Sequence, residues 1–191
     1  GAYASWGPTV ANRVPVHASG PYQVANYLAK SIAVHTNNVP AGAFRGFGVP
    51  QTAIALETSL SELAQKAGAD ELNFRMINAL RNGTPTVTGQ VFSSGVGITK
   101  CLEAVWPAWE RAKKYSSQYN NTSGKSIYKK GVGIATCWYG CGNTSIANPS
   151  TIRIGIRKNG QIILHQGATD IGQGSNTVIT QIVADAIQTD I

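Results

Sequence analysis

A glycine-rich loop at residues 43–48, Ala-Phe-Arg-Gly-Phe-Gly, combines residue types that could bind an anion. Glycine lets the backbone approach a ligand closely or adopt positive φ angles, and an arginine suits a phosphate or a polarised oxygen. Pro50 fits the first turn of a helix, and residues 52–66 have a helical pattern, so backbone N–H groups at the helix start would also attract an anion. For this loop taken alone, a tight turn whose phenylalanines fill a core remains the favoured interpretation.

A second glycine-rich loop, Gly-Ala-Thr-Asp-Ile-Gly-Gln-Gly, occupies residues 167–174. It follows a predicted hairpin whose turn contains Asn159-Gly160, the strongest short hairpin signal. A helix is predicted after it, with Ser175 or Asn176 as the N-cap. A strand, a glycine loop and a helix in this order can hold phosphate on backbone N–H groups. Neither loop is a nucleotide signature, so the pair suggests one anionic ligand held from two sides.

The cysteines do not form a recognisable metal or disulfide pattern. The chain has three cysteines, Cys101, Cys137 and Cys141, and an odd number fits a reducing, cytoplasmic setting. The spacing between Cys137 and Cys141 lacks both the CxxC pattern and the second ligand pair of a zinc site. No cysteine pattern for iron–sulfur ligation occurs either. We expect all three side chains to be small buried hydrophobes.

The composition indicates a globular protein with a hydrophobic core. The chain has 191 residues, of which 42% are hydrophobic and 13% are charged, enough for one sizeable domain or two small ones. No apolar run is long enough to predict a membrane span, and no secretion leader is recognised. The net charge of +7 comes partly from lysines and arginines between residues 111 and 130. A solvated surface accounts for that cluster better than nucleic-acid binding does.

The hydrophobic pattern predicts several helices and strands. The helix at 52–66 is closed by Gly68, and Asp70 begins a second helix whose buried side is predicted to contain Leu72, Phe74, Ile77 and Leu80. A third helix is predicted from about residue 97 to 115, with Pro107 as a kink or break, followed by a polar loop at 116–125. Strands are predicted at 1–8, 26–36, 90–92, 131–139, 151–157 and 161–166. The abrupt start suggests a piece cut from a larger domain.

The two loops resemble two motifs of one enzyme family. Residues 42–51, Gly-Ala-Phe-Arg-Gly-Phe-Gly-Val-Pro-Gln, resemble the AFRGFGxPQ motif of the molybdenum hydroxylases, the family of xanthine dehydrogenase and aldehyde oxidoreductase. Residues 167–174 are similar to the family's G-x-[TD]-[DE]-x-G-Q-G loop, and residues 1–3 resemble a strand upstream of the first motif. The resemblance covers essentially the whole chain. Two long motifs in the family's order and at its separation make it specific.

The resemblance implies an α+β fold of mixed sheets with packed helices. Residues 1–125 would end the first molybdopterin-binding region and residues 126–191 would begin the second. The implied cofactor is molybdopterin with molybdenum, as the cytosine dinucleotide in most bacteria. Five residues would bind it, largely through the backbone for the first three: Ala43, Phe44, Arg45, Gly172 and Gln173.

The resemblance also implies roles in substrate binding. Phe47 matches an aromatic residue that packs against the substrate ring. Arg13 lies 32 residues before Arg45, the family's spacing for an arginine that stabilises negative charge on the substrate, although an exposed arginine is the simpler interpretation. The second stacking aromatic falls at Gly142, so Trp138 or Tyr139 would have to supply that ring, or both are ordinary strand aromatics. A purine substrate is therefore no better supported than another N-heterocycle or an aldehyde.

The implied reaction is hydroxylation of an electron-poor carbon with oxygen drawn from water, with a glutamate as general base. Electrons would leave through iron–sulfur clusters to FAD on other domains or subunits. The family's GGGFGGK loop and its catalytic glutamate are absent from these residues, so the isolated chain is expected to be catalytically silent. The alternatives are a non-catalytic assembly or interaction module with the same fold, and a carbon monoxide dehydrogenase-like relative, whose copper-ligating cysteine loop does not occur here.

Overall fold

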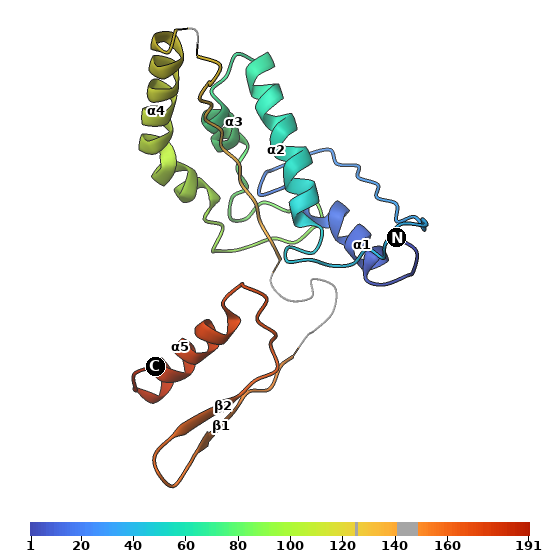
Figure 1. Ribbon diagram of the computed structural model, residues 1–191, viewed down its shortest axis with the longest axis vertical. Helices are drawn as coiled ribbons and strands as arrows, with labels where there is room; N and C mark the ends of the chain where they lie inside the picture. The colour runs from blue at the N-terminus through green and yellow to red at the C-terminus, as the bar shows by residue number, and fades with distance from the viewer. Residues whose placement is uncertain (125, 141–148) are drawn as a thin grey trace. The chain divides into compact units, whose positions relative to one another are not determined.

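The computed structural model describes residues 1–124, 126–140 and 149–191 of the chain (Figure 1). The chain divides into two compact units, Gly1–Tyr139 and Gly140–Ile191, and each is described by itself. The described part of the first unit contains helices α1 (Gly7–His17), α2 (Val49–Lys66), α3 (Glu71–Asn78) and α4 (Ile98–Thr122). The second contains strands β1 (Arg153–Ile156) and β2 (Ile162–His165) and helix α5 (Ser175–Ile187). The fold class is α+β, as the sequence predicts.

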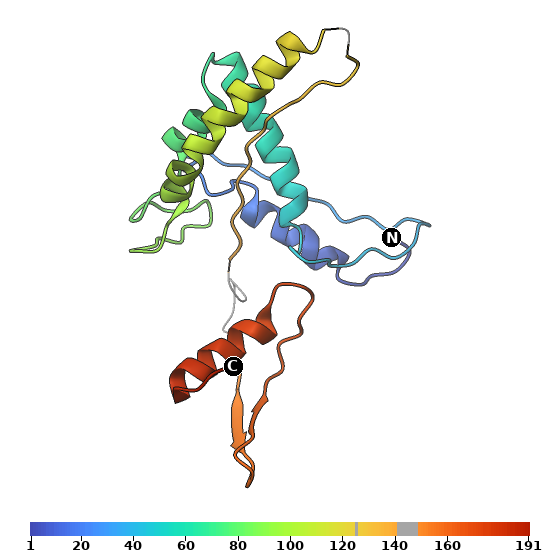
Figure 2. The ribbon, with the colours of Figure 1, turned by 60° about the vertical axis from the view of Figure 1, so that its left-hand side comes forward.

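Helix α2 begins directly after the first glycine loop, and α1 packs beside its N-terminal end (Figure 2). Pro50 lies in the first turn of α2, where its missing N–H leaves no helical bond unmade. Gly68 follows the helix with a φ of +64°, a left-handed conformation that suits glycine. The predicted helix and its C-terminal stop are both confirmed.

Helices α3 and α4 enclose the core of the first unit. The core consists of Leu72, Ala79, Leu102 and Trp109, with Val132 and Ile134 packed against it. Asp70 caps α3 by accepting hydrogen bonds from the backbone N–H groups of residues 72 and 73, which confirms the predicted helix start.

Several element predictions are wrong. Residues 1–8 and 26–36 form no strand, and α1 begins at Gly7 inside a segment that the sequence did not mark as helical. Residues 90–92 contribute only an isolated bridge, between Pro85 and Val91. Residues 131–139 are extended, but they pair with no strand among the described residues. Extended segments count as strands only where a neighbouring strand completes their hydrogen bonds.

Three further differences concern helix faces and ends. Ile77 is 68% exposed, whereas Arg75 is completely buried in its place. Helix α4 passes through Pro107 and continues to Thr122, so residues 116–122 are helical rather than a loop. The N-cap of α5 is Gly174, in a left-handed conformation, one residue before the predicted Ser175.

The second unit contains the predicted hairpin. Strands β1 and β2 pair antiparallel, from Arg153 opposite His165 to Ile156 opposite Ile162. Gly160 takes a φ of +82° in the turn, a left-handed conformation that suits glycine. Within the ranges that the structure describes, no helix is long and apolar enough to cross a membrane.

Candidate functional site

Arg13 lies between two aromatic rings in the first unit. Its guanidinium carbon is 5.5 Å from the centre of the Phe47 ring and 5.9 Å from the centre of the Tyr139 ring. Both distances fall within the range of cation–π attraction. Helix α1 supplies the arginine, the glycine loop supplies Phe47, and the extended segment 131–139 supplies Tyr139. Three segments that are distant in sequence therefore meet at one cationic group.

Further aromatic rings extend this cluster on both sides. Trp6 meets Phe47 edge-on, with ring centres 6.3 Å apart. On the other side, the His17 ring stacks on Tyr139 at 5.4 Å with an interplanar angle of 10°, and Trp138 meets His17 edge-on at 5.8 Å. We call Trp6, Arg13, His17, Phe47, Trp138 and Tyr139 the ring cluster. It presents flat apolar faces around one positive charge, an arrangement suited to a planar, electron-rich or anionic ligand.

The charge state of His17 follows from its surroundings. The side chain is buried, and burial lowers the pKa of His17 below its ordinary value. The hydrogen-bond contact of Nδ1 with the carbonyl oxygen of Arg13, at 3.0 Å, opposes this shift, while the positive charge of Arg13 adds to it. The imidazole is therefore neutral at pH 7, and Arg13 is the charged member of the ring cluster.

The glycine loop brings Phe47 to Arg13 because two of its glycines allow close contacts. A Cβ at Gly46 would lie 2.6 Å from the Pro50 ring, and a Cβ at Gly48 would lie 2.9 Å from the carbonyl oxygen of Val10 on α1. Both glycines also have φ near +100°, where other residues are strained. Phe47 itself has a φ of +47°, which is uncommon for a bulky residue and is typical of functional loops.

The cofactor-binding residues predicted in the first loop lie on the surface of the unit. Ala43, Phe44 and Arg45 are exposed, and the Phe44 side chain is 57% accessible. The loop is closed by backbone hydrogen bonds from Phe47 N–H to Phe44 O and from Val49 N–H to Gly46 O, each 2.9 Å long. This short, ordered turn leaves its outer backbone open to a ligand.

The second loop shows that its backbone N–H groups bind an anionic oxygen. The Asp170 carboxylate accepts hydrogen bonds from the N–H groups of Gly172, at 2.8 Å, and Asn176, at 3.1 Å. These bonds hold the pKa of Asp170 below its ordinary value. Gln173 folds back across the loop, where its amide donates to the Thr169 carbonyl and accepts from the N–H of Ile171. Within the loop these two N–H donors are therefore occupied by the Asp170 carboxylate.

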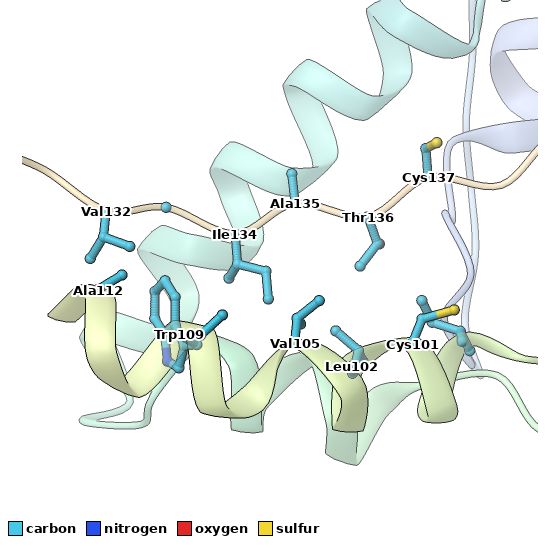
Figure 3. A pocket seen from close by; sticks show the side chains of 13 residues that line it. Cys101, Leu102, Val105, Trp109, Ala112, Val132, Ile134, Ala135, Thr136 and Cys137 are labelled. Carbon is cyan, nitrogen blue, oxygen red and sulfur yellow. The ribbon is translucent and has the colours of Figure 1, made fainter.

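An apolar groove of about 520 Å³ lies between α4 and residues 132–137 in the first unit (Figure 3). Cys101 and Cys137 line it, and both are free thiols with exposed side chains. The prediction that they are buried is therefore wrong, because each lies at an edge of the apolar packing rather than inside it. Cys141 lies outside the described residues. Among the residues that the structure describes, no cluster of histidine, cysteine and acidic residues could hold a metal ion.

The structure brings Arg13 and Phe47 together, whereas Gly172 and Gln173 belong to the other unit. Gly142, where the resemblance places a stacking aromatic, lies outside the described residues. Sequence reasoning missed Trp6 and His17. The spacing of Arg13 and His17, four residues apart, would have placed them on one face had the helix been recognised.

Comparisons with known proteins agree on one family. Two family profiles, both described as "Molybdopterin cofactor-binding domain", match residues 1–79 and residues 101–191. The chain is 46% identical over 103 residues to the nicotinate dehydrogenase large molybdopterin subunit of Eubacterium barkeri, covering 54% of the chain and 24% of that protein. It is 32% identical over 98% of its length to a putative xanthine dehydrogenase molybdenum-binding subunit of Escherichia coli, of which it covers 25%.

The solved structure of the aldehyde oxidoreductase from Desulfovibrio desulfuricans also resembles this chain. It matches with a TM-score of 0.80 and 25% sequence identity over 98% of the chain and 20% of that enzyme. The chain thus spans about a quarter of the length of the curated relatives that it matches.

Proposed function

The chain belongs to the molybdenum hydroxylase family, within its molybdopterin cofactor-binding domains, and we propose that it is part of the catalytic subunit of a molybdenum-dependent oxidoreductase. The substrate is an N-heterocycle of the nicotinate or xanthine type, or an aldehyde. The observation that carries this proposal is the placement of Arg13 between Phe47 and Tyr139. Relatives of the chain are described as nicotinate and xanthine dehydrogenases and as an aldehyde oxidoreductase, which supports the same range of substrates.

The ring cluster binds and orients the substrate. Phe47 packs against the substrate ring, and Tyr139 provides the second aromatic face, which the resemblance places at Gly142. Arg13 stabilises the negative charge that develops on the substrate as its carbon is attacked. His17, which stacks on Tyr139, is neutral because burial lowers its pKa, so Arg13 supplies the positive charge of the ring cluster.

Five residues hold the cofactor: Ala43, Phe44 and Arg45 in the first loop, and Gly172 and Gln173 in the second. The exposed backbone of the first loop supports this assignment. When bound, molybdopterin with molybdenum supplies hydroxylation with oxygen from water and accepts two electrons from the substrate. The cofactor is the cytosine dinucleotide form.

The electrons leave the site through iron–sulfur clusters and FAD on other domains or subunits. Two relatives are described as subunits, which supports a multi-subunit enzyme. Residues 1–125 belong to the first molybdopterin-binding region and residues 126–191 to the second. Cys101 and Cys137 are free thiols, which is consistent with a protein of the reducing cytoplasm.

The proposal is tested on the full-length protein. Acid release should yield molybdenum and CMP in equal amounts. Nicotinate, xanthine and aldehydes are then supplied as substrates, with an artificial electron acceptor. Turnover of at least one class is expected. Finding neither molybdenum nor CMP would favour a non-catalytic module instead.

A further inference from the structure

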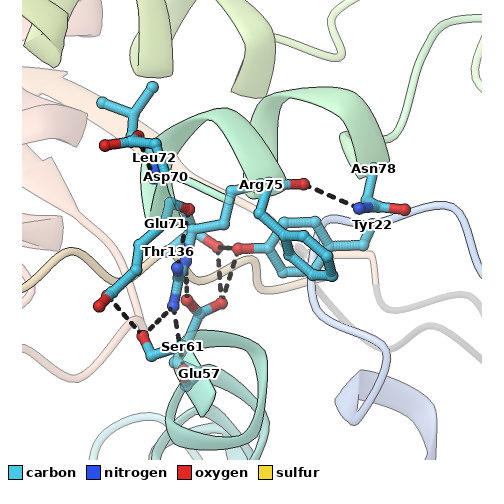
Figure 4. Close-up of polar contacts among 10 residues, drawn as sticks. Tyr22, Glu57, Ser61, Asp70, Glu71, Leu72, Arg75, Asn78 and Thr136 are labelled. Atoms are coloured by element: carbon cyan, nitrogen blue, oxygen red, sulfur yellow. Dashed lines mark hydrogen bonds and ion pairs between the residues drawn. The ribbon is translucent and has the colours of Figure 1, made fainter. Parts of the chain in front are cut away.

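A buried polar cluster in the first unit uses none of the residues of the ring cluster (Figure 4). We call Tyr22, Glu57, Arg75 and Thr136 the Glu57 network. Glu57 on α2 is 6% exposed and Arg75 on α3 is completely buried. The Nε of Arg75 donates to one carboxylate oxygen of Glu57, Oε2, at 2.7 Å. A charge pair at this depth is stable only when its remaining donors and acceptors also find partners.

Those partners are present on the arginine side. Arg75 Nη1 donates to the carbonyl oxygen of Glu71 at 3.0 Å. Nη2 donates to the carbonyl oxygen of Glu57 at 2.9 Å and to the Ser61 hydroxyl at 3.0 Å. All of these groups belong to α2 and α3. This half of the network therefore fixes the packing of two neighbouring helices.

The second carboxylate oxygen of Glu57 has a different role. It accepts hydrogen bonds from the Tyr22 hydroxyl at 2.8 Å and from the Thr136 hydroxyl at 2.9 Å. Burial raises the pKa of Tyr22 well above its ordinary value, so this hydroxyl keeps its proton. Both hydroxyl groups lie within hydrogen-bond distance of one negatively charged oxygen and, at 2.7 Å, of each other, so their two protons serve three close contacts, of which the charge-assisted ones are strong.

The two hydroxyl groups come from the segments that carry the rings. Tyr22 follows His17 by five residues, and Thr136 precedes Tyr139 by three. Glu57 stands on the helix that begins just after Phe47. One carboxylate therefore connects the helix next to Phe47 with the segments that hold the His17–Tyr139 stack.

The position of the extended segment 131–139 depends on the hydrogen bond between Thr136 and Glu57. Among the described residues it pairs with no strand. Val132, Ile134 and Thr136 point toward α4, whereas Ala135 and Cys137 point away (Figure 3). A slip by two residues would keep apolar side chains against α4 and would move Tyr139 by about 7 Å. It would also place Ile134 against the Glu57 carboxylate, which apolar groups cannot satisfy. The Thr136 hydroxyl thus selects one register.

We propose that Glu57 is a positioning residue of the substrate site: by binding the Thr136 hydroxyl, it sets the place of Tyr139 relative to Arg13 and Phe47. The statement about substrate rests on the function proposed above. The statement about position does not, because the separation of Tyr139 and Arg13 can be measured without turnover.

The test uses the full-length protein with the variants Thr136→Val, which removes the hydroxyl, and Thr136→Ser, which keeps it. Thr122→Val is the matched control, because the Thr122 hydroxyl bonds only to carbonyl groups of its own helix. Crystal structures should show the 5.9 Å separation of Arg13 and Tyr139 retained in Thr136→Ser and Thr122→Val and lost in Thr136→Val. An unchanged separation in Thr136→Val would overturn the proposal.

Steady-state kinetics supply a second readout. In Thr136→Val, KM for a ring-bearing heterocycle should rise by up to about ten-fold, the effect of losing one aromatic stacking contact with Tyr139, while KM for acetaldehyde stays within about two-fold. A merely structural role would reduce activity toward both substrates alike, and that result would contradict the proposal. If the parent protein turns over neither substrate, the proposed function fails, and the crystal structures alone decide the positioning role.

Discussion

Gly48 is the position where one added methyl group should disturb the ring cluster without removing any of its members. In Gly48→Ala, the new Cβ would lie 2.9 Å from the carbonyl oxygen of Val10 and 3.5 Å from the Cβ of Arg13. The first of these neighbours is backbone, so no side-chain rotation relieves the contact. Helix α1, or the loop, must move by several tenths of an ångström. Because α1 carries Arg13 and the loop carries Phe47, their 5.5 Å separation must change.

Two costs add in this variant. A residue other than glycine at a φ of +99° costs about 1–3 kcal/mol in backbone strain. Forcing a methyl group into a packed contact costs about 1–3 kcal/mol more. Gly95→Ala separates the two costs, because Gly95 has a φ of +86° and no atom within 4 Å of its added Cβ. It should show the strain alone.

Hydrogen exchange of the full-length protein measures the difference. Amides of residues 7–17 should exchange faster in Gly48→Ala, by about ten-fold or more, and at the parent rate in Gly95→Ala. Steady-state kinetics should show a loss of kcat/KM in Gly48→Ala alone. Equal exchange of these amides in the two variants would refute the packing of α1 on the loop at Gly48.

Three further predictions concern charges. Burial tends to raise the pKa of Asp70, but hydrogen bonds from Lys113 and Trp109 outweigh it and lower the pKa to about 2. The stability that this lowered pKa contributes is complete above the ordinary value of 3.8 and is lost as pH falls toward 2. In urea unfolding, Asp70→Asn should therefore lower the free energy of unfolding by about 1–2 kcal/mol at pH 7, a figure discounted for solvent screening, and by almost nothing at pH 2. Arg13→Met should lower kcat about 100-fold, and a kcat unchanged from the parent would exclude the charge-stabilising role. Asp170→Asn should speed hydrogen exchange at the Gly172 amide at neutral pH, since a neutral amide is a weaker acceptor.

The sequence predicted helix ends and turns correctly where residues close together in the chain determine them. Pro50 and Gly68 delimit α2, and Asn159-Gly160 forms the hairpin turn. Helix α1 was missed because it contains Pro15, which has no N–H to donate to the carbonyl oxygen of Ala11. The Ser31 hydroxyl donates to that oxygen instead. Such a partner, twenty residues away, is a tertiary contact that propensity rules do not include.

For the candidate site, the sequence pointed to individual residues rather than to their arrangement. A motif match selected Phe47 and a spacing match selected Arg13, and the structure places the two in contact, whereas Trp6 and His17 carry no motif and depend on α1. Tyr139, at the end of a predicted strand, was offered as a stacking ring, but nothing in the sequence indicated that it meets an arginine from another segment. The types of these residues can be read from the sequence, but the residues that contact them are known only from the folded structure.

Helix α3 shows why a hydrophobic pattern can misplace one position of a helix face, although Leu72 and Leu80 are buried as predicted. The pattern placed Ile77 inside, yet Ile77 is 68% exposed and Arg75 is fully buried. An arginine is tolerated there only because Glu57 neutralises it and four acceptor groups surround it. Removing Arg75 alone would leave the Glu57 carboxylate buried without its cation, a change that typically costs about 3–5 kcal/mol. An apolar pair could give equal stability, but it would offer no oxygen to bind the Thr136 hydroxyl. The buried charge is therefore explained better by the register that it imposes on residues 131–139 than by the stability that it contributes.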